Sequence, residues 1–425
     1  MLKIITAKYR QYSNVIVYVS SSVTKALTQI ISIVLIAKII APDDLGTWSF
    51  LSLFITYAAI LNLGIISGLN RELPYTLGMN KQEEATEMVQ TAYAFILCCS
   101  GIACLAGLGY AFLVPMPEKL FYGVLAITFM SLLSYYESFL ISTFRSNSAF
   151  KKLSQAQFIQ SILNVISLVL IYYYGYYGLI SKVVIVQLIY VAVLHYNRPF
   201  KVAAKWNTKH FVNIVKVGFP IYILAFGQSF SASFDRLWLL RISDNNMLGY
   251  YAFAFYGLTG ITILQTAISG YIYPKLTYAF GQSHDELQQW VYFKKITALM
   301  FAILLPICII GCLLMPFLME HLFPKYMPAL PAFRILLLAA VFLGSNIGIN
   351  IVMSMKKWKY ILQYQSLSIV LPLVFIVAFP FLITDKLIAI SSAVLTAYLL
   401  IFVAICIIAY RATHELKLKP SMQRP

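Results

Sequence analysis

Long apolar segments recur along the whole chain, and they restrict the possible folds more than any other feature. Of the 425 residues, 60% are hydrophobic and 11% are charged, whereas soluble domains average about 45–50% apolar and about 25% charged residues. A membrane helix needs about 20 apolar residues, so the chain has room for about 12 of them joined by short connections. We predict an all-α integral membrane protein with helices over residues 14–40, 46–69, 89–113, 121–144, 156–174, 179–195, 213–240, 249–272, 292–318, 331–353, 361–382 and 388–409.

The formal net charge of +17 is explained by membrane topology. With these helices, 23 of the 32 lysines and arginines fall on the side of the N-terminus. Lysine and arginine are enriched in cytoplasmic loops, so we predict that both termini are cytoplasmic, and we expect no nucleic-acid partner. The loops of the opposite side carry only Lys119, Lys182, Arg241, Lys325 and Lys386.

Signals of catalysis are missing from the sequence. The predicted connections are short, and the five histidines lie in loops or at helix ends. No Walker A sequence is present, and no pair of histidines has the spacing of a zinc site. The six cysteines fall inside predicted helices, where they are expected to act as small hydrophobic residues. We therefore expect no enzyme, no metal and no bound cofactor.

The chain contains an internal repeat. Residues 45–50 read Leu-Gly-Thr-Trp-Ser-Phe and residues 248–253 read Leu-Gly-Tyr-Tyr-Ala-Phe, an offset of 203 positions. Because six predicted helices separate the copies, both halves have the same orientation in the membrane, as in parallel-repeat transporters. We predict two parallel-repeat six-helix lobes, residues 1–205 and 206–425, around a central cavity that forms the substrate path.

Several charges lie inside the predicted helices, where each costs at least roughly 2.5–3.5 kcal/mol at a helix centre. Lys25 shares a helical face with Ser21, Thr28 and Ser32, at spacings of three, four and seven residues. Such a polar face avoids lipid. We expect it to face a cavity or another helix.

The other charges in the membrane each have a functional and a structural interpretation. Glu137 is either an ion-coupling group or a packing anchor two turns from Arg145. Asp235 is either a coupling group or a lock that pairs with Lys25. Arg236 is either a binding group or a side chain that extends toward the membrane surface. Since Asp235 and Arg236 are adjacent and so point about 100° apart, we expect that they do not pair with each other.

Several motifs together resemble a known family. Residues 37–48, Gly68-Leu69-Asn70-Arg71, Gly218-x-Pro220 and Asp235-Arg236 are similar to positions in bacterial O-antigen and polysaccharide flippases. These lipid-linked oligosaccharide flippases belong to the multidrug/oligosaccharidyl-lipid/polysaccharide exporter superfamily. The resemblance covers nearly the whole chain in helix number, loop length and repeat.

The resemblance implies a function. A flippase of this family turns undecaprenyl-diphosphate-linked oligosaccharide repeat units from the cytoplasmic to the periplasmic leaflet by alternating access, for O-antigen (lipopolysaccharide) or other surface polysaccharide. A basic cavity would offset the desolvation of the diphosphate. Glu137 and Asp235 are the candidates for coupling to protons or sodium ions. The candidates for substrate binding are Lys25, Gln29, Arg71, Arg145, Arg236 and Asn346.

The expected location is the bacterial inner membrane, and the expected partners are the lipid-linked oligosaccharide and membrane lipids. We predict a monomer that associates with a polymerase or chain-length regulator. Two alternatives stay open: an ion-coupled multidrug exporter of the same superfamily, and a membrane-embedded polysaccharide polymerase. A cationic drug would favour an acidic cavity, whereas in this chain the intramembrane bases at least equal the acids.

Overall fold

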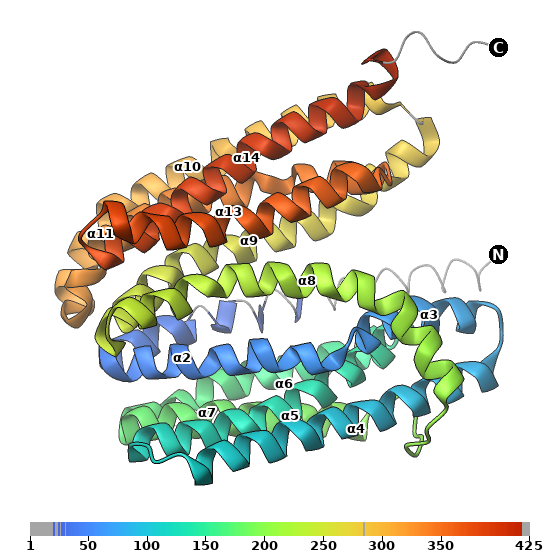
Figure 1. Ribbon diagram of the computed structural model, residues 1–425, viewed down its shortest axis with the longest axis horizontal. Helices are drawn as coiled ribbons and strands as arrows, with labels where there is room; N and C mark the ends of the chain where they lie inside the picture. The colour runs from blue at the N-terminus through green and yellow to red at the C-terminus, as the bar shows by residue number, and fades with distance from the viewer. Residues whose placement is uncertain (1–19, 22–23, 26, 30, 284, 419–425) are drawn as a thin grey trace. The chain divides into compact units, whose positions relative to one another are not determined.

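The computed structural model describes residues 20–21, 24–25, 27–29, 31–283 and 285–418. The described residues form helices joined by short connections, with no strand among them (Figure 1). Nine helical segments in this part of the chain are long and apolar enough to cross a membrane. The predicted class, an all-α integral membrane protein, is therefore confirmed.

Each predicted membrane segment corresponds to one helix or to successive helical segments. Residues 14–19 of the first predicted helix lie outside the described residues, and the helix is described over Leu27–Ile39. The others are α2 (Pro42–Ala58), η1 (Ala59–Asn62), α3 (Ile65–Gly78), α4 (Gln82–Leu113), α5 (Glu118–Ser146), α6 (Phe150–Ile166), α7 (Leu168–Tyr196), α8 (Thr208–Ile242), α9 (Asn245–Ser283), α10 (Glu286–Leu322), η2 (Pro324–Ala329), α11 (Leu330–Ser345), η3 (Asn346–Gly348), α12 (Ile349–Ser354), α13 (Trp358–Leu382) and α14 (Lys386–Leu418).

Many helices are longer than their apolar segments. The helix predicted over 89–113 begins at Gln82, and the helix predicted over 249–272 continues to Ser283. The extra turns contain more polar residues than the apolar segments. A helix can extend beyond the hydrocarbon into water, where hydropathy no longer marks its end. The predictions therefore located the apolar part of each helix rather than its termini.

The helix predicted over 46–69 is interrupted near its middle. Leu63 and Gly64 both have left-handed backbone angles, with φ of 47° and 81°. A Cβ atom on Gly64 would lie 2.7 Å from backbone atoms of Gly218 in α8. Glycine is required here on two counts: its backbone angle is costly for other residues, and no side chain fits against α8.

The chain reverses direction at Gly175, inside the segment α7. Gly175 has φ of 54° and ψ of −123°, and a Cβ atom on Gly178 would lie 2.0 Å from the carbonyl oxygen of Leu170. The Lys182 Nζ atom donates a hydrogen bond to Asn164 Oδ1 at 2.5 Å, although 18 residues of continuous helix would separate them by about 27 Å. Residues 168–174 and 176–196 are therefore two antiparallel helices. The break between them agrees with the predicted helices, of which one ends at 174 and the next begins at 179.

Contacts between Cα atoms divide the chain into two compact units. Unit 1 comprises residues 1–40 and 50–227, and unit 2 comprises residues 41–49 and 228–425. Within unit 1, α3, α4, α5 and α7 surround a core that includes Leu69, Ile96, Phe144 and Tyr190. Within unit 2, α9, α10, α12, α13 and α14 enclose a second apolar core. The two lobes inferred from the sequence repeat, residues 1–205 and 206–425, stay a prediction.

The repeat is visible in a reciprocal contact within unit 2. A Cβ atom on Gly46 would lie 1.9 Å from the carbonyl oxygen of Asn245, and one on Gly249 would lie 1.8 Å from the carbonyl oxygen of Pro42. Both pairs of equivalent residues, 42 with 245 and 46 with 249, differ by the predicted offset of 203. Gly46 of the first copy thus contacts Asn245 of the second, and Gly249 of the second copy contacts Pro42 of the first. This exchange of equivalent contacts is the pattern of two-fold symmetry.

We expect Gly249→Ala to destabilise the protein by about 1–3 kcal/mol, because the new methyl group meets backbone that cannot move aside. Gly101→Ala is the matched control, since its Cβ would have nothing within 4 Å. That control should leave stability unchanged or raise it by up to about 1 kcal/mol through helix propensity. Unfolding in mixed micelles measures both, and equal effects of the two substitutions would contradict the close approach at Gly249.

Candidate functional site

In unit 1, opposite charges within the predicted helices act on each other electrostatically, although no ion pair joins them directly among the described residues. Lys25 of the first helix and Glu137 of α5 are close enough to attract each other, and Arg145 in the last turn of α5 acts on Lys25 as a like charge. The Lys25 Nζ atom also lies 5.3 Å from the centroid of the Tyr190 ring in α7. This distance permits a cation–π interaction. Three predicted site residues, Lys25, Glu137 and Arg145, therefore form one electrostatic cluster.

An amide joins Glu137 to its neighbours. Gln187 of α7 donates from Nε2 to Ser134 Oγ at 2.8 Å and to Glu137 Oε2 at 3.3 Å. These hydrogen bonds connect α5 to α7. A partly buried carboxylate in hydrocarbon needs such donors, because no water replaces them.

The polar face of the first helix packs against α6, one of the two situations predicted for it. Ser21 Oγ donates to Gln157 Oε1 at 2.7 Å, and Ser32 Oγ donates to the carbonyl oxygen of Asn164 at 3.5 Å. Lys182 was counted among the loop cations, and this assignment was wrong. Lys182 is 4% exposed in α7, and the Gly175 turn brings it against the Asn164 side chain.

In unit 2, the buried acid is Asp235 of α8, which is 2% exposed. The Tyr251 hydroxyl of α9 donates to Asp235 Oδ2 at 2.5 Å, and the backbone N–H of Arg236 donates to Oδ1 at 2.7 Å. The expectation that Asp235 and Arg236 do not pair was wrong, since Arg236 Nε lies 3.6 Å from Asp235 Oδ1. The carboxylate bends back toward its neighbour because the low dielectric strengthens their attraction. The Arg236 guanidinium also lies 5.0 Å from the centroid of the Phe255 ring.

A small cavity lies beside Asp235. Its volume of about 10 Å³ is about what one water molecule needs. Its walls include Ser231, Tyr398 and Pro372 of α13. Ser231 Oγ donates to the carbonyl oxygen of Ile369, one turn before Pro372, at 2.9 Å. Proline interrupts helical hydrogen bonding, and a neighbouring serine can satisfy the carbonyls nearby.

The remaining site candidates are Asn346, Arg71 and Gln29. Asn346 donates from Nδ2 to the Tyr364 hydroxyl at 2.6 Å. Arg71 is exposed and has only a distant contact with Glu72, at 3.9 Å. Gln29 is exposed. The role of these three residues in binding stays a prediction.

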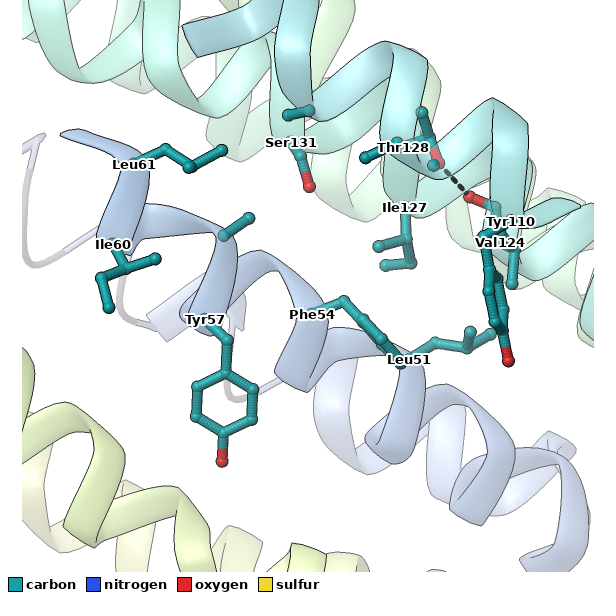
Figure 2. Close-up of a pocket in the computed structure, with 14 residues that line it drawn as sticks. Leu51, Phe54, Tyr57, Ile60, Leu61, Tyr110, Val124, Ile127, Thr128 and Ser131 are labelled. Atoms are coloured by element: carbon teal, nitrogen blue, oxygen red, sulfur yellow. Dashed lines mark hydrogen bonds between the residues drawn. The ribbon is translucent and has the colours of Figure 1, made fainter.

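Unit 1 also contains an apolar groove of about 430 Å³. Figure 2 shows it between α2 and η1 on one side and α4 and α5 on the other, with Phe54, Leu61, Ile127 and Ser131 among the residues around it. The Tyr57 ring points away from α5. Nearly all of the lining is hydrocarbon, so the groove suits an apolar chain.

Sequence reasoning missed the partners of the buried charges. Gln187 carries no sequence signal beyond being a polar residue in an apolar segment, and many such residues only join helices. Tyr251 lies in the repeated segment 248–253, but the repeat does not indicate a carboxylate partner for it. Lys182 did have a signal, because it lies four residues inside the predicted helix 179–195. Its position near the helix end made a loop location equally consistent with the sequence.

The electrostatic attraction between Lys25 and Glu137 can be tested by a double-mutant cycle of Lys25→Met and Glu137→Gln. Each single change leaves a buried charge without its opposite, so the double variant should lose less stability than the two singles added. We expect a coupling energy of about 0.5–3 kcal/mol from unfolding in mixed micelles. Strict additivity would contradict the attraction.

Comparison with known proteins shows to which family the chain belongs. The model of the polysaccharide biosynthesis protein family matches residues 34–326. No curated protein sequence matches the chain.

Solved membrane transporters have the same fold. An inward-facing multidrug resistance MATE family transporter of the MOP superfamily is 13% identical, with a TM-score of 0.71 and coverage of 96% of this chain and 99% of that one. The lipid II flippase MurJ, in an inward closed conformation, is 13% identical with a TM-score of 0.70 and coverage of 96% and 94%. The Vibrio cholerae MATE transporter VcmN is 13% identical, with a TM-score of 0.59 and coverage of 97% and 99%.

The structural likeness establishes the fold, and the family model extends over more than half of the chain. This multi-pass membrane protein, with the fold of MOP-superfamily transporters, therefore belongs to the polysaccharide biosynthesis protein family.

Proposed function

We propose that this protein is a flippase that moves undecaprenyl-diphosphate-linked oligosaccharide repeat units from the cytoplasmic to the periplasmic leaflet. The observation that carries the proposal is the membership in a polysaccharide biosynthesis family of a chain with a transporter fold. Such a protein serves O-antigen or other surface polysaccharide synthesis without catalysing a reaction. Its place is the bacterial inner membrane, with both termini cytoplasmic.

The cluster of Lys25, Glu137 and Arg145 supports an anionic substrate. Two cations and one carboxylate leave a net positive charge among these residues. A diphosphate that enters hydrocarbon loses its hydration, and charge-assisted hydrogen bonds to lysine and arginine compensate for part of that loss. Glu137 and Asp235 serve as the proposed coupling sites for protons or sodium ions, and alternating access is the proposed mechanism.

The groove in Figure 2 supports a lipid-linked substrate in particular. Ser131 of α5 lines the groove, one turn before Ser134. Gln187 Nε2 donates to Ser134 and also to Glu137. An apolar site and a charged cluster therefore lie on consecutive turns of one helix. We propose that the groove holds part of the polyprenyl chain while the diphosphate lies near Lys25.

The function is tested by deleting the gene and locating the lipid-linked oligosaccharide with an impermeant sugar-modifying probe on oriented vesicles. We expect accumulation in the cytoplasmic leaflet, relieved by the wild-type gene and not by one encoding Lys25→Glu or Arg236→Glu, because charge reversal repels a diphosphate. Single units that reach the periplasmic leaflet without polymerisation would instead indicate a polymerase. Unchanged sidedness with normal polymer would indicate a drug exporter.

The polyprenyl site is tested by filling the groove. Ala106 lines it, so Ala106→Trp should lower the rate of transport several-fold by excluding part of the chain. The control is Leu105→Trp on the same helix, where the side chain is 74% exposed and does not line the groove. Transport assays in the deletion strain should show near-normal activity for the control, and equal activity of both variants would rule the groove out.

A further inference from the structure

A separate, basic pocket lies at one end of the hairpin formed by α6 and α7. It has a volume of about 430 Å³ and is lined by Lys152, His195, Tyr196, Asn197, Arg198 and Lys201. Lys152 is in the first turn of α6, and His195 and Tyr196 end α7. The reversal at Gly175 returns the chain to its starting side, so residues 45 positions apart meet at the same end of the two helices.

The cations of the pocket lack counter-charges. No carboxylate lines it, and within the described residues the ion pairs involve none of Lys152, Arg198 and Lys201. Three like charges around one cavity repel each other. Lys152 adds to this, since a lysine in the first turn of a helix also opposes the positive end of the helix dipole. The arrangement therefore concentrates positive charge that a bound anion would offset.

Two carbonyl acceptors near the pocket already accept side-chain hydrogen bonds. Arg198 Nη1 donates to the carbonyl oxygen of His195 at 2.8 Å, and Asn197 Nδ2 donates to that of Val193 at 3.0 Å. These bonds cover carbonyls at the C-terminus of α7, which would otherwise repel an anion. The His195 ring is fixed by a 2.5 Å contact between its Nδ1 atom and the Tyr136 hydroxyl. The wall is therefore held in place, while the ammonium groups of Lys152 and Lys201 are exposed.

The position of the pocket indicates where its ligand comes from. The topology predicted from the basic residues places this end of the hairpin at the cytoplasmic surface. Tyr196 is 81% exposed there, as is common for tyrosine at the level of lipid headgroups. The anions concentrated at that level are lipid phosphates.

We propose that this pocket binds the phosphate group of a membrane lipid at the cytoplasmic surface. The ligand is either an anionic phospholipid or the diphosphate of a lipid-linked sugar, since both present the same phosphate chemistry. The inference does not depend on the proposed transport function. Lysine and arginine together suit it, because arginine binds phosphate oxygens in a bidentate manner and lysine adds mobile point charges.

The test uses the full-length protein in a neutral detergent, with the triple variant Lys152→Gln/Arg198→Gln/Lys201→Gln. Binding of dioleoyl phosphatidylglycerol, with phosphatidylcholine as reference, is measured by native mass spectrometry, and binding of farnesyl diphosphate by equilibrium dialysis. The matched control is Lys205→Gln/Lys209→Gln/Lys216→Gln, which removes three exposed charges from the same predicted side outside the pocket.

We expect the pocket variant to bind at least one phosphate probe about tenfold more weakly than wild type, because charge-assisted hydrogen bonds are lost. The control should stay within about twofold, as expected for screened surface charges. Loss of phosphatidylglycerol binding identifies a phospholipid ligand, and loss of farnesyl diphosphate binding alone identifies a lipid-linked diphosphate. Equal losses in pocket and control variants, or no preference of wild type for either probe over phosphatidylcholine, would overturn the proposal.

Two single variants guard against misfolding of the triple variant. Lys201→Gln changes an exposed side chain and should weaken binding of the same probe about two- to threefold, since it removes one of the three charges whose joint loss costs about tenfold. Arg198→Lys keeps the charge and should retain most of the binding. If Lys201→Gln and Arg198→Lys both bind like wild type and the triple variant does too, the pocket is not a phosphate site.

Discussion

Inside the hydrocarbon of a membrane an ionised side chain has no water around it, so each charge there needs protein partners. Unit 1 provides them for Lys25 through Glu137 and the Tyr190 ring, and for Lys182 through Asn164. Unit 2 provides them for Asp235 through the Tyr251 hydroxyl and Arg236. Apart from the contact between the adjacent residues Asp235 and Arg236, these contacts join different helical segments, so groups that could act on a substrate also hold helices together.

Close packing at glycine is the second constraint. Lipid gives little driving force for helices to associate, and small residues let backbones approach instead. Gly46 and Gly249 meet the carbonyl oxygens of Asn245 and Pro42 in a reciprocal contact, and Gly64 meets α8 at Gly218. The residues of the two contacts differ by 203 positions, the same offset as the sequence repeat, so the contact supports a duplication.

A flippase of lipid-linked sugars must handle hydrocarbon, phosphate and sugar in one molecule. The proposed roles divide these tasks among the apolar groove of unit 1, the Lys25 cluster and the polar side chains of both units. The basic pocket at the end of the α6–α7 hairpin adds a phosphate site at the membrane surface, outside the spanning region. A MATE-type exporter shares the fold, so the distinction between cargoes depends on these side chains and not on the helical framework.

The sequence by itself determined the helical framework. Apolar segments mark membrane helices because the hydrocarbon thickness fixes their length, and the offset of 203 marked the repeat. The positions of Lys25, Glu137, Asp235 and Arg236 inside helices also followed from hydropathy. Only the tertiary structure decided which groups these charges contact. Asp235 and Arg236 were expected to diverge by helical geometry, yet they pair, because side-chain rotation in a low dielectric outweighs the 100° between adjacent positions. Lys182 became a buried residue only through the turn at Gly175, since a contact between helices depends on backbone angles that hydropathy does not encode.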